Sequence, residues 1–204
     1  MIKLSFYEIP LSNREYGTMA DPLKEIEINN KKMWITKPQE HDIIAQRVET
    51  AFNIALGKLL ETKGNIETVM QTGEAFGRGI FADLIQEKPE EWTMQEWLES
   101  VITHIFNPMG HGFTITEISD NCIKSMMTRN PLHEKSSERN IVGLFTYGFT
   151  RGLFLSAFPK GELIMDNTTL TDDPLTEYTF KINPLHRDRL ERERVKNFFI
   201  TTKK

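Results

Sequence analysis

The chain has 204 residues, 39% of them hydrophobic and 26% charged, which is the balance of an ordinary folded domain with an apolar core. A chain of this length buries roughly 70% of its unfolded surface, so it folds without a metal, and its single Cys122 excludes an internal disulfide. The net charge of -4 argues against nucleic acid as a partner, and no apolar run is long enough to span a membrane. The lone thiol and the lack of a signal-peptide pattern at the start favour a cytoplasmic protein.

The opening part, residues 1–37, is predicted to be an extension built on strands. Hydrophobic and polar residues alternate at 2–6, and two further short strands at 26–28 and 33–35 flank a polar turn that begins with two asparagines. Asparagine tolerates the positive φ that tight hairpin turns require. These two strands are therefore predicted to form a β-hairpin.

Three helices are predicted to follow. Apolar residues recur at helical spacing in 44–59 and again in 66–84. The third helix begins with Thr93 and Glu96, whose spacing is that of a capping box, and extends to about Phe106.

The next part of the chain alternates between strands and a helix. Residues 113–118 and 122–127 alternate as two strands, and a polar loop at 129–136 leads to an apolar helix at about 137–158. Two short strands at 161–166 and 176–182 complete this part.

The last predicted element is a helix at 184–199, with proline in its first turn. The tail from His186 to Lys204 has seven basic residues and three acidic ones. Its candidate binding partners are therefore an acidic partner, an anionic membrane and RNA. The interleaved acids favour a solvated helix instead.

This order predicts an α+β fold, an antiparallel sheet with helices packed on one side and an N-terminal strand or hairpin extension. The predicted organisation has three parts: the extension at 1–37, a main domain at 38–183, and a basic C-terminal helix and tail at 184–204.

Glycines interrupt two of the predicted helices. An interior helical glycine costs about 0.5–1 kcal/mol relative to alanine, so its presence calls for a compensating reason. Close approach of another helix and room for a ligand both satisfy that requirement. The glycines are Gly73, Gly77 and Gly79 in one helix and Gly143, Gly148 and Gly152 in the other.

Several of these motifs together carry a family resemblance. The matching pieces are Gly73–Gly77, the hairpin at 113–127 followed by Asn130-Pro131, Tyr147–Gly152, Asp172–Pro174 and Tyr178–Phe180. Over residues 40–182 the chain resembles the 4-vinyl-reductase domain family, also called predicted hydrocarbon-binding proteins. The resemblance implies a small-molecule-binding domain that is commonly dimeric. Its fold is shared with vesicle-tethering subunits and, distantly, with haem nitric-oxide sensors.

Some members of that family hold a zinc ion with cysteines and an acid. The resemblance places the corresponding positions of this chain at Gly143, Thr168, Thr171 and Tyr178. Hydroxyl groups are poor zinc ligands beside thiolate, imidazole or carboxylate. No metal and no cofactor are therefore expected here.

A second place to look for chemistry is the stretch that contains two histidines and the cysteine. His104 and His111 flank a helix-breaking turn, and Cys122 follows on the next strands. They are either a converging metal or nucleophile cluster, or loop histidines and an inert thiol. The spacing matches no recognised ligand motif, so no catalytic residue is assigned.

Aromatic and sulfur-containing residues are abundant on the elements expected to face one another. They predict a mostly apolar ligand pocket with a few orienting polar groups, and the alternative is an ordinary packed core. The predicted pocket residues are Trp97, His104, Phe113, Met127, Phe145, Tyr147, Phe149 and Arg151.

The function predicted from these features is a non-enzymatic small-molecule-binding or sensory module. It would act as a homodimer and bind a small apolar or aromatic ligand. One alternative is a structural adaptor, whose core is packed solid and which acts through dimerisation surfaces. The other is an enzyme of tetrapyrrole-type metabolism, which the family name alone suggests.

Overall fold

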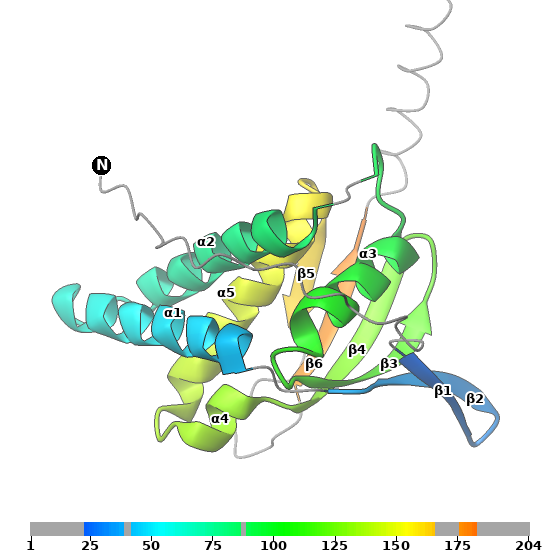
Figure 1. The fold of residues 1–204 in the computed structure, drawn as a ribbon, viewed down its shortest axis with the longest axis horizontal. Helices are drawn as coiled ribbons and strands as arrows, with labels where there is room; N and C mark the ends of the chain where they lie inside the picture. Colours follow the sequence, from blue (N-terminus) through cyan, green and yellow to red (C-terminus); the bar gives the residue numbers. More distant parts are fainter. Residues whose placement is uncertain (1–22, 39–41, 87–88, 166–175, 183–204) are drawn as a thin grey trace, which may run out of the picture.

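The computed structural model describes residues 23–38, 42–86, 89–165 and 176–182 (Figure 1). The predicted strand at 2–6, Thr168 and Thr171, and the basic C-terminal part at 184–204 lie outside these ranges. Within them, no helix combines the length and apolar character that crossing a bilayer requires.

The strands form a single six-stranded antiparallel sheet in the order β1-β2-β3-β4-β6-β5. Helices pack on one side of this sheet (Figure 1), which confirms the predicted α+β class. The strands are β1 (Leu23–Ile28), β2 (Lys31–Thr36), β3 (Gly112–Ile118), β4 (Cys122–Arg129), β5 (Glu162–Met165) and β6 (Thr176–Lys181). The helices are α1 (Asp42–Glu61), α2 (Ile66–Leu84), α3 (Met94–Val101), the π-helical turn η1 (Ile102–Phe106), α4 (Pro131–Lys135) and α5 (Arg139–Ala157).

The predicted hairpin near the start of the chain is confirmed as β1–β2. Asn29 and Asn30 form its turn with φ values of 51° and 60°. Strand β2 then pairs with β3 over a short antiparallel ladder. The Thr36 hydroxyl adds a hydrogen bond to this pairing, because it accepts from the Phe113 amide at 2.8 Å. The described part of the predicted extension is thus an edge of the main sheet, and it projects beyond the helices in Figure 1.

Helices α2 and α5 cross so closely that their backbones are in contact. A Cβ atom built on Gly148 would lie 2.9 Å from the carbonyl carbon of Met70, and one built on Gly73 would lie 3.0 Å from the amide nitrogen of Phe149. Gly77 and Gly152 have equally close backbone neighbours on the opposite helix. Close helix packing therefore explains these four glycines, whereas a Cβ on Gly79 would meet open space.

The predicted capping box at the start of α3 is present. The Thr93 hydroxyl accepts from the Glu96 amide at 3.1 Å, and the Glu96 carboxylate accepts from the Thr93 amide at 3.0 Å. The helix does not continue regularly to Phe106, however, because it widens at Ile102 into the π-helical turn η1. This turn leads the chain into β3.

Helix α4 was not expected, since 129–136 was predicted to be a polar loop. Asn130 begins it, and its side-chain oxygen accepts from the Leu132 amide at 3.1 Å. Pro131 occupies the first helical position, where its missing N–H costs nothing. The Asn-Pro pair was thus a helix-start signal within a polar stretch.

Candidate functional site

Four predicted pocket aromatics are core residues that pack against other rings. Trp97, Phe113, Phe145 and Phe149 are each at most 4% exposed. The Trp97 ring lies about 5 Å from the ring of Phe180, and its Nε1 donates to a backbone carbonyl of α5 at 3.3 Å. None of the four rings lines either of the two cavities described below.

Two predicted polar pocket groups serve contacts between elements. The Tyr147 hydroxyl donates to the carbonyl oxygen of Leu163 at 3.2 Å, which ties α5 to β5. Arg151 forms an ion pair with Glu74, which ties α5 to α2 beside the glycine crossing. Neither side chain lines those two cavities.

The two histidines and the cysteine do not converge. His104 is exposed on η1, whereas His111 is buried just before β3. His111 and Cys122 lie at opposite ends of the β3–β4 hairpin, which at about 3.3 Å per residue separates them by roughly 20 Å. Among the described residues, no group of three or more His, Cys, Asp or Glu side chains is placed to hold a metal ion.

Cys122 is also a poor nucleophile. Burial and the neighbouring Glu117 carboxylate raise the pKa of its thiol, and the Lys124 and Lys181 ammonium groups offset only part of this. The reactive species of cysteine is the thiolate, so a raised pKa lowers its reactivity near neutral pH.

A cavity of about 100 Å³ lies where the N-terminal half of α5 and the short α4 meet the ends of β4 and β6. We call it the α4–α5 cavity. Its lining residues are Met127, Thr128, Arg129, Asn130, His133, Glu134, Gly143, Thr146, Thr176 and Tyr178.

Four of these lining residues were singled out by the sequence, including Asn130, which belongs to the Asn130-Pro131 motif of the family resemblance. Met127 is one of the predicted pocket residues. Gly143 and Tyr178 are two of the positions at which the resemblance places the family's metal ligands. The fold thus brings these two positions, which are 35 residues apart, into the wall of one cavity.

The charged groups of this wall are paired with one another. Arg129 donates from Nε and Nη2 to the two carboxylate oxygens of Glu134, at 3.1 and 3.3 Å, and from Nη1 to the carbonyl oxygen of Gly110 at 3.3 Å. The geometry is two-pronged, but both side chains are largely exposed, at 40% and 53%, so water screens the pair. The wall therefore holds one cation and one anion that neutralise each other.

His133 supplies an unsatisfied group. Its Nε2 is buried and has no hydrogen-bond partner among the described residues. Burial and the nearby Arg139 guanidinium lower the pKa of His133, which favours the neutral imidazole. On the opposite wall, burial and the proximity of Tyr147 raise the pKa of the Tyr178 phenol. Both rings are therefore neutral near pH 7.

Asn130 fastens the two helices that form the cavity. Its Nδ2 donates to the Thr146 hydroxyl of α5 at 3.1 Å, while its Oδ1 caps α4. Thr146 is only 2% exposed, so this bond is protected from water. Asn130 thereby fixes the position of His133, three residues further along α4.

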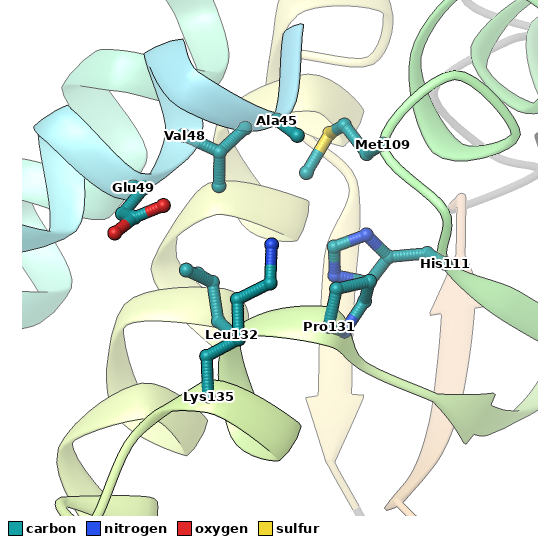
Figure 2. A pocket seen from close by; sticks show the side chains of 8 residues that line it. All are labelled: Ala45, Val48, Glu49, Met109, His111, Pro131, Leu132 and Lys135. Carbon is teal, nitrogen blue, oxygen red and sulfur yellow. The ribbon is translucent and has the colours of Figure 1, made fainter. Parts of the chain in front are cut away.

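A second, much smaller cavity of about 10 Å³ lies between α1 and α4 (Figure 2). His111 faces it, is 2% exposed, and has an Nδ1 atom without a partner in the described part of the chain. Figure 2 shows Lys135 reaching past Leu132 toward the space between Val48 and this imidazole. The volume is about that of a single water molecule.

The buried His111 is held in its neutral form. Burial and the Arg129 guanidinium lower its pKa from the ordinary 6.5 to about 3, and a hydrogen bond with the Asn130 side chain opposes them only in part. His111 thus helps to position the wall of the α4–α5 cavity, because it is hydrogen-bonded to Asn130, which links α4 to α5.

None of the main polar residues of the cavity was predicted from the sequence to be a site residue. Asn130, His133, Thr146 and Thr176 come from a predicted loop, a helix and the start of a strand. The Asn130-Pro131 pair was the available signal, since it places His133 on a first helical turn. Neither threonine carries a comparable signal.

No family model matches the chain, and neither the curated proteins nor the solved structures gave a match. The chemistry that the site supports therefore follows from its own residues.

Proposed function

We propose that the protein is a non-enzymatic small-molecule-binding module and that the α4–α5 cavity is its binding site. The observation that carries the proposal is the buried Nε2 of His133, which has no protein partner in the described residues and lines this cavity. A buried polar atom left without a partner costs about 1–3 kcal/mol, and a bound molecule in the cavity would remove that cost.

The position of the cavity supports the same proposal. Gly143 and Tyr178, which the resemblance assigns to the family's ligand-bearing positions, both line it. All of its lining residues except Met127 and Gly143 carry a polar group, although apolar atoms still form the larger part of its surface. At about 100 Å³ it is also well below the roughly 300–1,000 Å³ typical of sites for drug-sized ligands. A space of this size gives no support to a tetrapyrrole ligand.

Native mass spectrometry of freshly purified protein tests this proposal by reporting bound mass and oligomeric state together. Thr176 is 5% exposed in the cavity wall, and replacing it by Phe adds a ring to this space. Thr176→Phe is expected to abolish retention of the bound molecule. Glu177→Phe is the matched control, because Glu177 is exposed on the next position of the same strand.

The proposal is wrong if the wild-type protein carries nothing and gains nothing from a metabolite extract. It is equally wrong if Thr176→Phe retains the bound mass as well as Glu177→Phe does.

A second candidate function is assembly through a homodimer surface. Leu60 and Ile66 flank the turn between α1 and α2 and are 81% and 52% exposed. Large exposed apolar side chains that lie together are typical of interaction surfaces. If a second copy covers this turn, Leu60→Glu is expected to shift the native mass from dimer to monomer. Ile28→Glu, at a similarly exposed residue on the β1–β2 hairpin, is expected to leave it unchanged.

A further inference from the structure

The walls of the α4–α5 cavity also indicate the class of molecule that would occupy it, provided that the cavity is the binding site proposed above. Its only described ionic groups, Arg129 and Glu134, are bonded to each other through both carboxylate oxygens. His133 is neutral, and Arg139, which acts on it, is exposed and outside the cavity wall. A charged guest would find no unpaired counter-charge among the described lining residues, whereas a neutral polar guest needs none.

The hydrogen-bonding groups call for a polar guest. The unpartnered Nε2 of His133 lines the cavity together with Thr146, Thr176 and Tyr178, which are 2%, 5% and 2% exposed. A neutral imidazole nitrogen either donates or accepts, and a hydroxyl group does both. A purely apolar molecule would leave Nε2 unsatisfied, and leaving it so costs more than its net hydrogen bond contributes.

The size of the cavity limits the guest. The smaller cavity of about 10 Å³ is about the size of one water molecule, so a cavity of about 100 Å³ has room for several waters or for a small organic molecule. Met127 and the ring of Tyr178 provide an apolar side for a short carbon chain. The geometry thus combines one polar end with a small apolar remainder.

We propose that the α4–α5 cavity binds a small uncharged molecule that carries a hydroxyl or primary amide group. His133 Nε2 holds the polar group, and Met127 with the Tyr178 ring contacts the carbon chain. Because Arg129 and Glu134 are paired with each other, the wall offers no net charge to attract an ion of either sign. This pairing makes charge the property that selects the guest.

Four probes of nearly equal size test the proposal: 1-propanol, propionamide, propionate and propylammonium. Binding is followed by shifts of the imidazole and amide resonances of the full-length protein during titration. The alcohol and the amide are expected to shift the His133 and Thr146 signals and to bind at least tenfold more tightly than either ion. His133→Leu is expected to abolish these shifts, and His133→Gln, which keeps a polar group, to restore them in part.

His104→Leu is the matched control, because this histidine is exposed on η1 and does not line the cavity. It is expected to bind the probes as wild type does. If propionate or propylammonium binds more tightly at the same resonances, the proposed ligand class is wrong while the binding site stands. If no probe shifts any cavity resonance and no bound mass is found, both proposals fail. If His133→Leu binds the amide unchanged, His133 does not hold the guest.

Discussion

Alanine at Gly148 is expected to destabilise the protein by forcing α2 and α5 apart. The new Cβ would lie 2.9 and 3.0 Å from the carbonyl carbon and Cα of Met70, and still closer to its carbonyl oxygen. Ordinary van der Waals contact begins at 3.4 Å, and backbone atoms cannot swing aside as a flexible side chain can. The helices must therefore separate by about half an ångström or more, which forfeits a quarter or more of the dispersion energy at each contact they lose.

The size of the effect follows from two opposing contributions. Overpacking a tight interface costs about 1–3 kcal/mol, and replacing glycine by alanine inside a helix returns up to about 1 kcal/mol. We expect Gly148→Ala to lower the free energy of unfolding by about 1–2 kcal/mol, which is a fall of several degrees in Tm for a chain of this size. Gly79→Ala is the matched control on α2. Its Cβ meets open space, so it is expected to stabilise the protein by about 0.5–1 kcal/mol.

Urea unfolding, followed by circular dichroism and by tryptophan fluorescence, to which the buried Trp97 contributes, measures both variants. Equal stabilisation by Gly148→Ala and Gly79→Ala would show that the two helices are not in backbone contact. The double variant Gly77→Ala/Gly148→Ala provides a further check. Because the first substitution already separates the helices, the second is expected to cost less than it does alone.

Three further predictions concern titration, sheet pairing and thiol reactivity. The unfolded chain protonates His111 below pH 6.5, whereas the folded protein does so only near pH 3. Stability present above pH 6.5 is therefore lost as the pH falls, by up to about 1.4 kcal/mol per pH unit, and urea unfolding of His111→Gln should show a shallower slope. Thr36→Val removes the hydroxyl that accepts from the Phe113 amide and is expected to cost about 1–2 kcal/mol and to speed hydrogen exchange at that amide. Cys122, with its pKa raised by burial and Glu117, is expected to react with iodoacetamide several-fold more slowly in native than in unfolded protein, as mass spectrometry would show.

Local patterns in the sequence were sufficient for most of the fold. The positive φ values at Asn29 and Asn30 and the capping box at Thr93 are set by residues a few positions apart, so their signals survive in the sequence. The alternation at 113–127 likewise identified the β3–β4 hairpin. Helix α4 was missed because five polar-rich residues give no hydrophobic period, although Asn130 marked its start.

The glycines show where a local pattern leaves two outcomes open. An interior glycine has the same helical cost whether its missing Cβ makes room for another backbone or for a ligand. Only the register between two helices whose contacting residues are more than 70 positions apart in the sequence decides between these outcomes. Here Gly148 faces Met70 and Gly152 faces Glu74, so the room is taken by backbone. Gly79, in the same helix as Gly73, faces neither.

The cavity was harder to predict because it is a space that the neighbouring side chains leave unfilled. No residue type indicates by itself that such a space is present. A phenylalanine gives the same sequence signal whether its ring lines a cavity or packs in a solid core. Phe145 and Phe149 pack in the core. Polar residues carry more information, because a buried polar atom must be matched by a partner. In this chain Asn130 has its partners in Leu132 and Thr146, while His133 Nε2 has none among the described residues. That difference appears only once α4 is placed against α5, and it is the observation on which the proposed binding site rests.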